Sequence, residues 1–291
     1  MGAIGYAARE HESVDGFLAL AGDFLAAHEA ENNLLFGICG NVQAHPELFL
    51  DPAPTFATVH DRAGRVVAAS LRTPPWNQVL SWIDDLDGID PLVEMLRDRS
   101  LPGAGGPKEA SARFAAAWTV TTGQPARLAT QERIFRLERV VAPERTPRGT
   151  WRIADARDRD LIAEWFVAFH DEATPESPTV DARGVADRII AQVGRTGYLW
   201  EDGGEVVSLV GAGGATPNGI RIGPVYTPPD RRGRGYASAL TAAASQDQLD
   251  RGRRFVFLFT DLANPTSNKI YQAIGYEPVC DVDVYLFAAD A

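Results

Sequence analysis

The stretch Thr227-Pro-Pro-Asp-Arg-Arg-Gly-Arg-Gly-Tyr-Ala-Ser-Ala-Leu240 joins the end of an expected strand to the start of an expected helix. A β-branched strand end precedes it, and an Arg/Gly run separates its two prolines from a helical pattern. Glycines at such a junction let the backbone approach a ligand closely, and the first N–H groups of a helix carry a partial positive charge. The stretch therefore predicts an anion site, most suitably for a pyrophosphate, with an ordinary loop of solvated arginines as the alternative.

The composition indicates a globular chain without a membrane or nucleic-acid role. The 291 residues are 45% hydrophobic and 23% charged, and the formal net charge is −11, which disfavours wholesale nucleic-acid binding. The start of the chain lacks the basic and apolar regions of a signal peptide, and no apolar run approaches membrane-spanning length, so we expect a cytoplasmic protein. Cys39 and Cys280 are expected to be free thiols, and the five histidines show no metal-ligand spacing.

The sequence repeats one plan twice. The segments 59–70 and 199–210 each indicate a strand, an acidic/Gly turn and a second strand. A helical apolar stripe precedes each hairpin, and a further helix and a late alternating strand follow it, at residues 134–137 and 282–287. A Pro-rich linker at 142–149 separates the copies. We therefore predict two α/β domains at 1–145 and 150–291, each with a mixed central sheet flanked by helices.

The copies differ at the anion site. After its strand pairs, copy one is acidic over residues 80–91 and has no Arg/Gly run, and acidic side chains would repel a pyrophosphate. Its glycine cluster at 103–108 lacks the spacing of a phosphate-binding P-loop and is expected to be a turn before a helix at 108–118. The second copy is therefore the one expected to bind an anion.

A second motif follows an apolar strand at 254–260. Asn264 fits a helix N-cap position with Pro265 at the first helical position, and Gly275 fits a left-handed helix end. Asn264, Asn268 and Tyr271 are spaced four and three residues apart, which places them on one helix face.

The order of these two motifs resembles the GNAT family of N-acetyltransferases over residues 150–288. The resemblance implies tandem acetyltransferase-like domains, of which the first is a degenerate copy and the second binds acetyl-CoA without needing a metal. The strand before the Arg/Gly run would pair with the pantetheine arm, and the run would hold the pyrophosphate. The residues implied in cofactor binding are Val225, Tyr226, Thr227, Arg232, Gly233, Arg234, Gly235, Tyr236, Ala237, Ser238, Asn264 and Asn268.

Tyr271 matches the usual general acid of that family. The assignment is chemically reasonable because a thiolate leaving group, whose thiol has a pKa of about 8.5, needs a nearby proton. An amine attacking a thioester also creates an oxyanion, which needs a fixed N–H donor. The alternative for Tyr271 is a packed core tyrosine.

The general base is less clearly marked. The strand before the Arg/Gly run contains no carboxylate, whereas Asp171, Glu172 and Glu176 follow the first helix of copy two, a segment that borders the acceptor site in the family. Glu172 is the candidate, with a solvated polar loop as the alternative for each of the three. Asp281 and Asp283 are expected to face water.

The expected activity is direct transfer of an acetyl group from acetyl-CoA to the primary amine of a small molecule, by a monomer or homodimer. An acceptor at a protein N-terminus or lysine is an alternative, and so is a non-catalytic acyl-CoA sensor.

Overall fold

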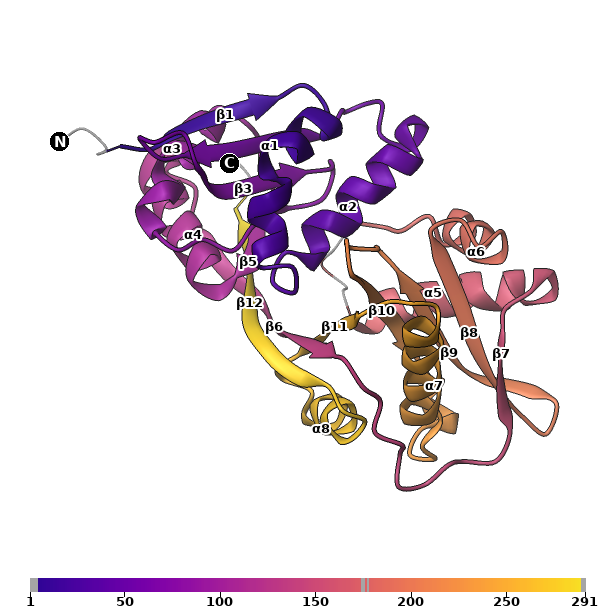
Figure 1. Ribbon diagram of the computed structural model, residues 1–291. Coiled ribbons are helices and arrows are strands. Elements are labelled where there is room, and N and C mark those ends of the chain that lie inside the picture. The colour runs from indigo at the N-terminus through magenta and orange to yellow at the C-terminus, as the bar shows by residue number, and fades with distance from the viewer. Residues whose placement is uncertain (1–4, 174–175, 177, 289–291) are drawn as a thin grey trace. The chain divides into compact units, whose positions relative to one another are not determined.

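The two halves of the chain contain the same elements in the same order in the computed structural model, which describes residues 5–173, 176 and 178–288 (Figure 1). The first half contains β1 (Ala7–His11), α1 (Val14–Ala27), α2 (Asn33–Ala44), β2 (Thr55–His60), β3 (Val66–Arg72), β4 (Gln78–Leu80), α3 (Ile89–Leu96), β5 (Gly103–Pro107), α4 (Lys108–Thr122) and β6 (Ala126–Leu137). The second half contains β7 (Thr150–Ile153), α5 (Arg159–Ala173), α6 (Ala182–Ile190), β8 (Arg195–Asp202), β9 (Glu205–Gly213), β10 (Gly219–Tyr226), α7 (Tyr236–Asp250), β11 (Phe255–Asp261), α8 (Pro265–Ala273) and β12 (Glu277–Phe287). The predicted duplication of a mixed α/β plan is confirmed.

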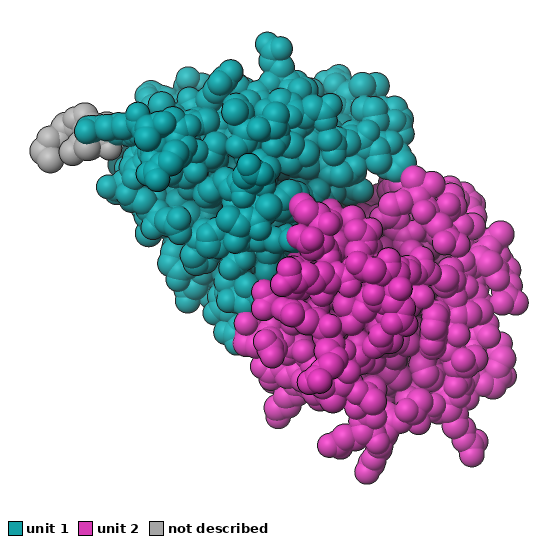
Figure 2. Space-filling view, viewed as in Figure 1, with its two compact units in different colours: residues 1–134, 261–263, 279–291 teal, residues 135–260, 264–278 magenta. Residues whose placement is uncertain are grey.

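Two compact units divide the chain, and neither is one continuous segment (Figure 2). Unit 1 comprises residues 1–134, 261–263 and 279–291, and unit 2 comprises residues 135–260 and 264–278. The segment from Val279 onward, which the sequence analysis placed in the second domain, therefore belongs to the unit formed by the first half.

In unit 1, helices cover both faces of a sheet with the order β1-β2-β3-β4-β5-β12. Neighbouring strand residues point to opposite faces, so Phe56 packs with α1 and α2 while Ala57 packs with α3 and α4. Helix α1 begins where the Ser13 side chain accepts a hydrogen bond from the Gly16 N–H, and its buried face repeats at helical spacing. All pairs in this sheet are antiparallel except β4 with β5.

The last strand of the second half joins the sheet of unit 1, next to β5. Residues Val282–Leu286 of β12 pair antiparallel with Pro107–Gly103 of β5. The expectation that the late strand at 282–287 serves its own copy is therefore wrong for this segment. An alternating pattern shows that a strand has a buried face, but not which neighbour it pairs with.

The glycine cluster forms strand β5 at Gly103–Pro107 and not the expected turn. A Cβ atom at Gly103 would lie 2.3 Å from the Tyr285 carbonyl oxygen, and one at Gly106 would lie 2.7 Å from that of Leu80. The glycines therefore allow a close backbone approach on either side of β5. Helix α4 follows directly and runs slightly beyond the predicted 108–118.

In unit 2, the strand order next to the final residues of β6 is β11-β10-β9-β8-β7. Tyr198 and Val210 face the cluster that contains α7 and α8, while Leu199 and Leu209 face the cluster that contains α5 and α6. Strands β10 and β11 are parallel, and the other pairs between β7 and β10 are antiparallel. The sheet therefore presents the carboxyl ends of β10 and β11 at the same edge.

Candidate active site

Strand β10 separates from β11 part-way along its length. The parallel pairing covers Gly219–Arg221 opposite Phe255–Phe257, whereas both strands continue further, to Tyr226 and Asp261. On its other side, β10 pairs with β9 at Ile222 and then at Val225, with a register shift between them. Because Gly223 and Pro224 together oppose one residue of β9, the strand bulges at that point. Past the bulge, backbone groups on the β11 side of β10 have no strand partner among the described residues.

The Arg/Gly loop (residues 227–235) connects β10 to α7. Gly233 and Gly235 have φ angles of +76° and +85°, which are left-handed values that glycine adopts without strain. Gly235 is the N-cap of α7 and supplies no side-chain hydrogen bond. The first N–H groups of the helix, at Tyr236, Ala237 and Ser238, therefore have no partner within the helix and carry its positive dipole end.

The arginines of the loop are held in different ways. Arg231 pairs with Glu205 at 2.7 Å, and Arg234 donates a hydrogen bond to the Asp230 carbonyl at 3.3 Å. Arg232 donates from Nε to the Thr227 carbonyl at 2.9 Å, and its Nη2 contacts the Glu172 carboxylate. All three guanidinium groups remain at least one-third exposed or lie in an exposed turn, so a dissolved anion can reach them.

Helix α8 follows the predicted pattern at its start. The Asn264 side chain accepts a hydrogen bond from the Ser267 N–H at 3.1 Å, and Pro265 is the first helical residue. Asn268 donates to the Asn264 carbonyl at 3.0 Å and accepts a hydrogen bond from the Thr260 hydroxyl. Asn264 therefore caps the helix, and Asn268 connects its first turn to the end of β11.

Tyr271 lies in the core cluster that also contains Ile222 of β10 and Leu258 of β11. Its side chain is 9% exposed, and no hydrogen-bond partner of its hydroxyl occurs among the described residues. Burial raises the pKa of Tyr271 to about 12. The ring of Tyr276 packs edge-on at 6.1 Å, and its own hydroxyl is bonded to Ser245 Oγ at 2.8 Å. Tyr271 is thus protonated at neutral pH, and its O–H donates no hydrogen bond to any described residue.

Residues 159–276 match the family model of the acetyltransferase (GNAT) family. This match identifies residues 159–276 as a GNAT-type segment. The match supports an acyltransferase activity, and the matched segment contains the bulged strand, the Arg/Gly loop and the helix that carries Tyr271.

Solved structures with the same fold span nearly the whole chain. A Drosophila protein of 16% identity covers 99% of this chain and 100% of its own, with a TM-score of 0.70. A tandem GNAT protein from the clavulanic acid biosynthesis pathway has 16% identity, covers 98% of this chain and 99% of its own, and has a TM-score of 0.60. A GCN5-related N-acetyltransferase from Sphaerobacter thermophilus has 17% identity, covers 96% of this chain and 94% of its own, and has a TM-score of 0.58. At these identities the likeness concerns the fold, which is that of tandem GNAT domains.

A search of curated protein sequences found no match. Among the helices of the described residues, none is both long and apolar enough to cross a bilayer.

The structure brings most of the implied GNAT cofactor residues to one edge of the unit 2 sheet. Those at the end of β10 and in the Arg/Gly loop are Val225, Tyr226, Thr227, Arg232, Gly233, Arg234, Gly235, Tyr236, Ala237 and Ser238. Two of them have evident packing roles. The Tyr226 ring is buried against Trp165 at 5.7 Å, and the Thr227 hydroxyl bonds Ser208 at 2.9 Å. Their backbone groups, and not their side chains, therefore suit ligand binding.

Two of the acidic residues lie elsewhere. Asp281 pairs with Arg133 at 2.6 Å, and Asp283 accepts a hydrogen bond from Gln131 at 3.2 Å. Asp283 is only 2% exposed, so the expectation that it faces water is wrong. Both belong to unit 1 because β12 pairs with β5 of that sheet.

The family resemblance implied a bulged end of this strand, but Gly223 and Pro224 were not identified from the sequence as the residues that form the bulge. A proline inside an otherwise strand-like segment was the available signal, since proline within a sheet marks an edge or a bulge.

Proposed function

We propose that unit 2 transfers an acetyl group from acetyl-CoA directly to the primary amine of a small molecule. The observation that carries the proposal is the divergence of β10 from β11 beside the uncapped first turn of α7. An extended pantetheine arm can add to the open side of β10, while the pyrophosphate meets the N–H groups of the helix start. Gly233 leaves this approach open, since a Cβ placed on it would have no atom within 4 Å.

Transfer requires one bond to form and one to break. The amine nitrogen attacks the thioester carbonyl carbon, the C–S bond breaks, and the nitrogen loses a proton. A backbone N–H just past the bulge can stabilise the oxyanion, with Val225 as the first residue there that has an N–H, since Pro224 has none. The Tyr271 hydroxyl is proposed to protonate the departing thiolate, because it is protonated at neutral pH and not otherwise bonded in the described chain.

Glu172 is retained as a candidate base, although its geometry limits that role. Both carboxylate oxygens accept hydrogen bonds from Arg232, so an amine proton would have to compete with a guanidinium. A side chain at this position can instead regulate how Arg232 meets an anion.

The direct test is release of free thiol from acetyl-CoA across a panel of amines, amino acids, polyamines, aminoglycosides and lysine-containing peptides. We expect turnover with at least one small amine, with acetyl-CoA binding that depends on Arg232. Turnover restricted to peptides would replace the small-molecule acceptor with a protein one. Binding of acetyl-CoA without turnover on any member would favour an acyl-CoA sensor.

A further inference from the structure

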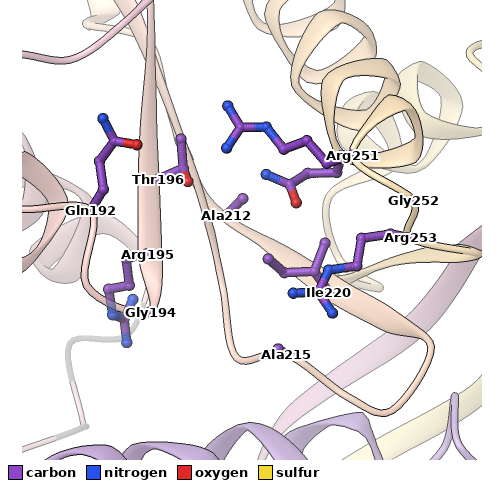
Figure 3. A pocket seen from close by; sticks show the side chains of 11 residues that line it. Gln192, Gly194, Arg195, Thr196, Ala212, Ala215, Ile220, Arg251, Gly252 and Arg253 are labelled. Carbon is purple, nitrogen blue, oxygen red and sulfur yellow. The ribbon is translucent and has the colours of Figure 1, made fainter.

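A second concave site lies in unit 2, at the opposite end of α7 from the Arg/Gly loop (Figure 3). It has a volume of about 310 Å³, and the first residues of β8 and β10 and the last turn of α7 line it. Helix α7 has 15 residues, so its two ends are roughly 22 Å apart at 1.5 Å per residue. The pocket is therefore separate from the proposed cofactor site.

Three arginines line this pocket. Figure 3 shows Arg195 on one side and Arg251 and Arg253 on the other. Arg251 pairs with Asp247 at 2.7 Å. Arg195 and Arg253 have no ion pair or side-chain hydrogen bond among the described residues. The pocket therefore contains more guanidinium charge than nearby carboxylates neutralise.

The environment of Arg195 is unfavourable for an isolated cation. Burial lowers its pKa, and the neighbouring Arg188 lowers it further. Burying a charge without a partner costs desolvation free energy. An anion bound beside Arg195 would offset that cost, which no protein group among the described residues offsets.

Asp247 and Gln248, which lie in the last turns of α7, are already engaged with other side chains. Asp247 accepts a hydrogen bond from the Tyr198 hydroxyl as well as pairing with Arg251. Gln248 donates to the same Tyr198 oxygen at 2.7 Å. The Asp247 carboxylate is thus paired, whereas the guanidinium groups of Arg195 and Arg253 have no partner among the described residues.

We propose that this pocket binds a small dianionic oxyanion, either a phosphate monoester or a dicarboxylate. Guanidinium groups present planar N–H forks that match phosphate and carboxylate oxygens. Ala212, Ala215 and Ile220 supply an apolar wall for the remainder of such a ligand. The volume is at the lower end of that of small-molecule sites, which suits a small metabolite and not a polymer.

The test is calorimetric titration of the full chain with phenyl phosphate, inorganic phosphate and succinate, each with and without saturating coenzyme A. We expect one dianion per chain with a Kd of roughly 1 mM or tighter, unchanged by coenzyme A. Arg253→Gln, which removes a half-buried side chain, should weaken binding about tenfold or more, and Arg195→Gln should do the same. Arg254→Gln is the matched control, because the Arg254 guanidinium lies over the Phe255 ring at 4.8 Å and is not part of the pocket lining.

The outcomes separate the possibilities. Stronger binding of phenyl phosphate than of succinate assigns the site to phosphate monoesters, and the reverse order assigns it to dicarboxylates. Binding that coenzyme A abolishes would place the anion at the Arg/Gly loop and overturn the proposal. Unsaturable titrations, or equal affinity in Arg253→Gln and wild type, would also overturn it. Arg253→Gln remains informative if Arg195→Gln does not fold.

Discussion

The Nη2 atom of Arg232 donates hydrogen bonds to both carboxylate oxygens of Glu172, at 2.9 and 2.7 Å. Sequence reasoning assigned these residues to separate roles, one on the cofactor and one on the acceptor amine. Their contact means that a pyrophosphate approaching Arg232 meets a carboxylate already in place. The pair joins α5 to the Arg/Gly loop, and both side chains are about half exposed, at 46% for Glu172 and 48% for Arg232.

Replacing Glu172 by glutamine should act mainly on the cofactor. Removing the competing charge should lower KM for acetyl-CoA by up to about fivefold, the range of an exposed ion pair, with little change in kcat. Steady-state kinetics measure both quantities, and Asp171→Asn is the control on the same helix. A hundredfold fall in kcat at unchanged KM would instead identify Glu172 as the general base.

Tyr271→Phe should reduce kcat by about 10²–10⁴-fold, the usual contribution of a positioned general acid. Because the hydroxyl makes no hydrogen bond in the described chain, its loss should leave the thermal midpoint nearly unchanged. Tyr276→Phe is the matched control, since it loses the bond to Ser245 and should cost about 1 kcal/mol of stability while retaining activity. Wild-type turnover in Tyr271→Phe would show that another group protonates the thiolate.

The activity should not fall on the alkaline side up to about pH 10. Burial raises the pKa of Tyr271 to about 12, so its proton is retained well past the ordinary tyrosine pKa of about 10. The donor is lost only as the pH rises through its raised value, whereas the acceptor amine gains reactivity over the same range. Initial rates in overlapping buffers from about pH 6 to pH 10 test this, and a descending limb anywhere below about pH 10 would contradict it.

Gly235→Ala should weaken acetyl-CoA binding as well as the fold. An alanine at φ +85° costs about 1–2 kcal/mol in the left-handed region, and relaxation would redirect the first N–H groups of α7. Gly203→Ala is the control, because φ there is +63° and a Cβ would have no atom within 4 Å. Both variants should lose similar stability in denaturant unfolding, and only Gly235→Ala should lose affinity for coenzyme A.

A fragment of residues 1–145 should fail to fold cooperatively. It lacks the strand that pairs with β5, and the open edge would favour aggregation. Joining residues 279–288 to it through a flexible linker should restore a cooperative thermal transition. The same fusion with Val284→Pro should not, because Val284 lies opposite Gly105 in the ladder. Cooperative unfolding of the unfused fragment would contradict the expectation.

Local features of this chain were predictable because short-range chemistry determines them. The Asn264 cap, the start of α7 after Gly235 and both hairpins follow from the residues at those positions. The partner of β12 was not predictable, since an alternating strand fits any sheet with a matching edge. The glycines of β5 were wrongly assigned to a turn for the same reason. Glycine is needed there because a Cβ atom would clash with backbone oxygens of residues distant in sequence.

The candidate site shows the same division. The Arg/Gly loop and Tyr271 follow from motifs, whereas the engagement of Glu172 by Arg232 depends on how α5 packs beside the loop. The two unpaired arginines at the far end of α7, Arg195 and Arg253, carried no motif, since they come from two separate segments of the chain.

The pairing of β12 with β5 has a consequence for folding during translation, because the two strands are synthesised far apart in time. The ribosome makes Pro107 about 175 residues before Val282, its partner in the ladder. At roughly 5–20 residues per second, translation leaves the glycine-rich edge of β5 uncovered for about 10–35 s. During that interval the unpaired edge of β5 in the nascent chain can pair with strands of other chains. Ribosome-bound chaperones should therefore be needed most at this stage.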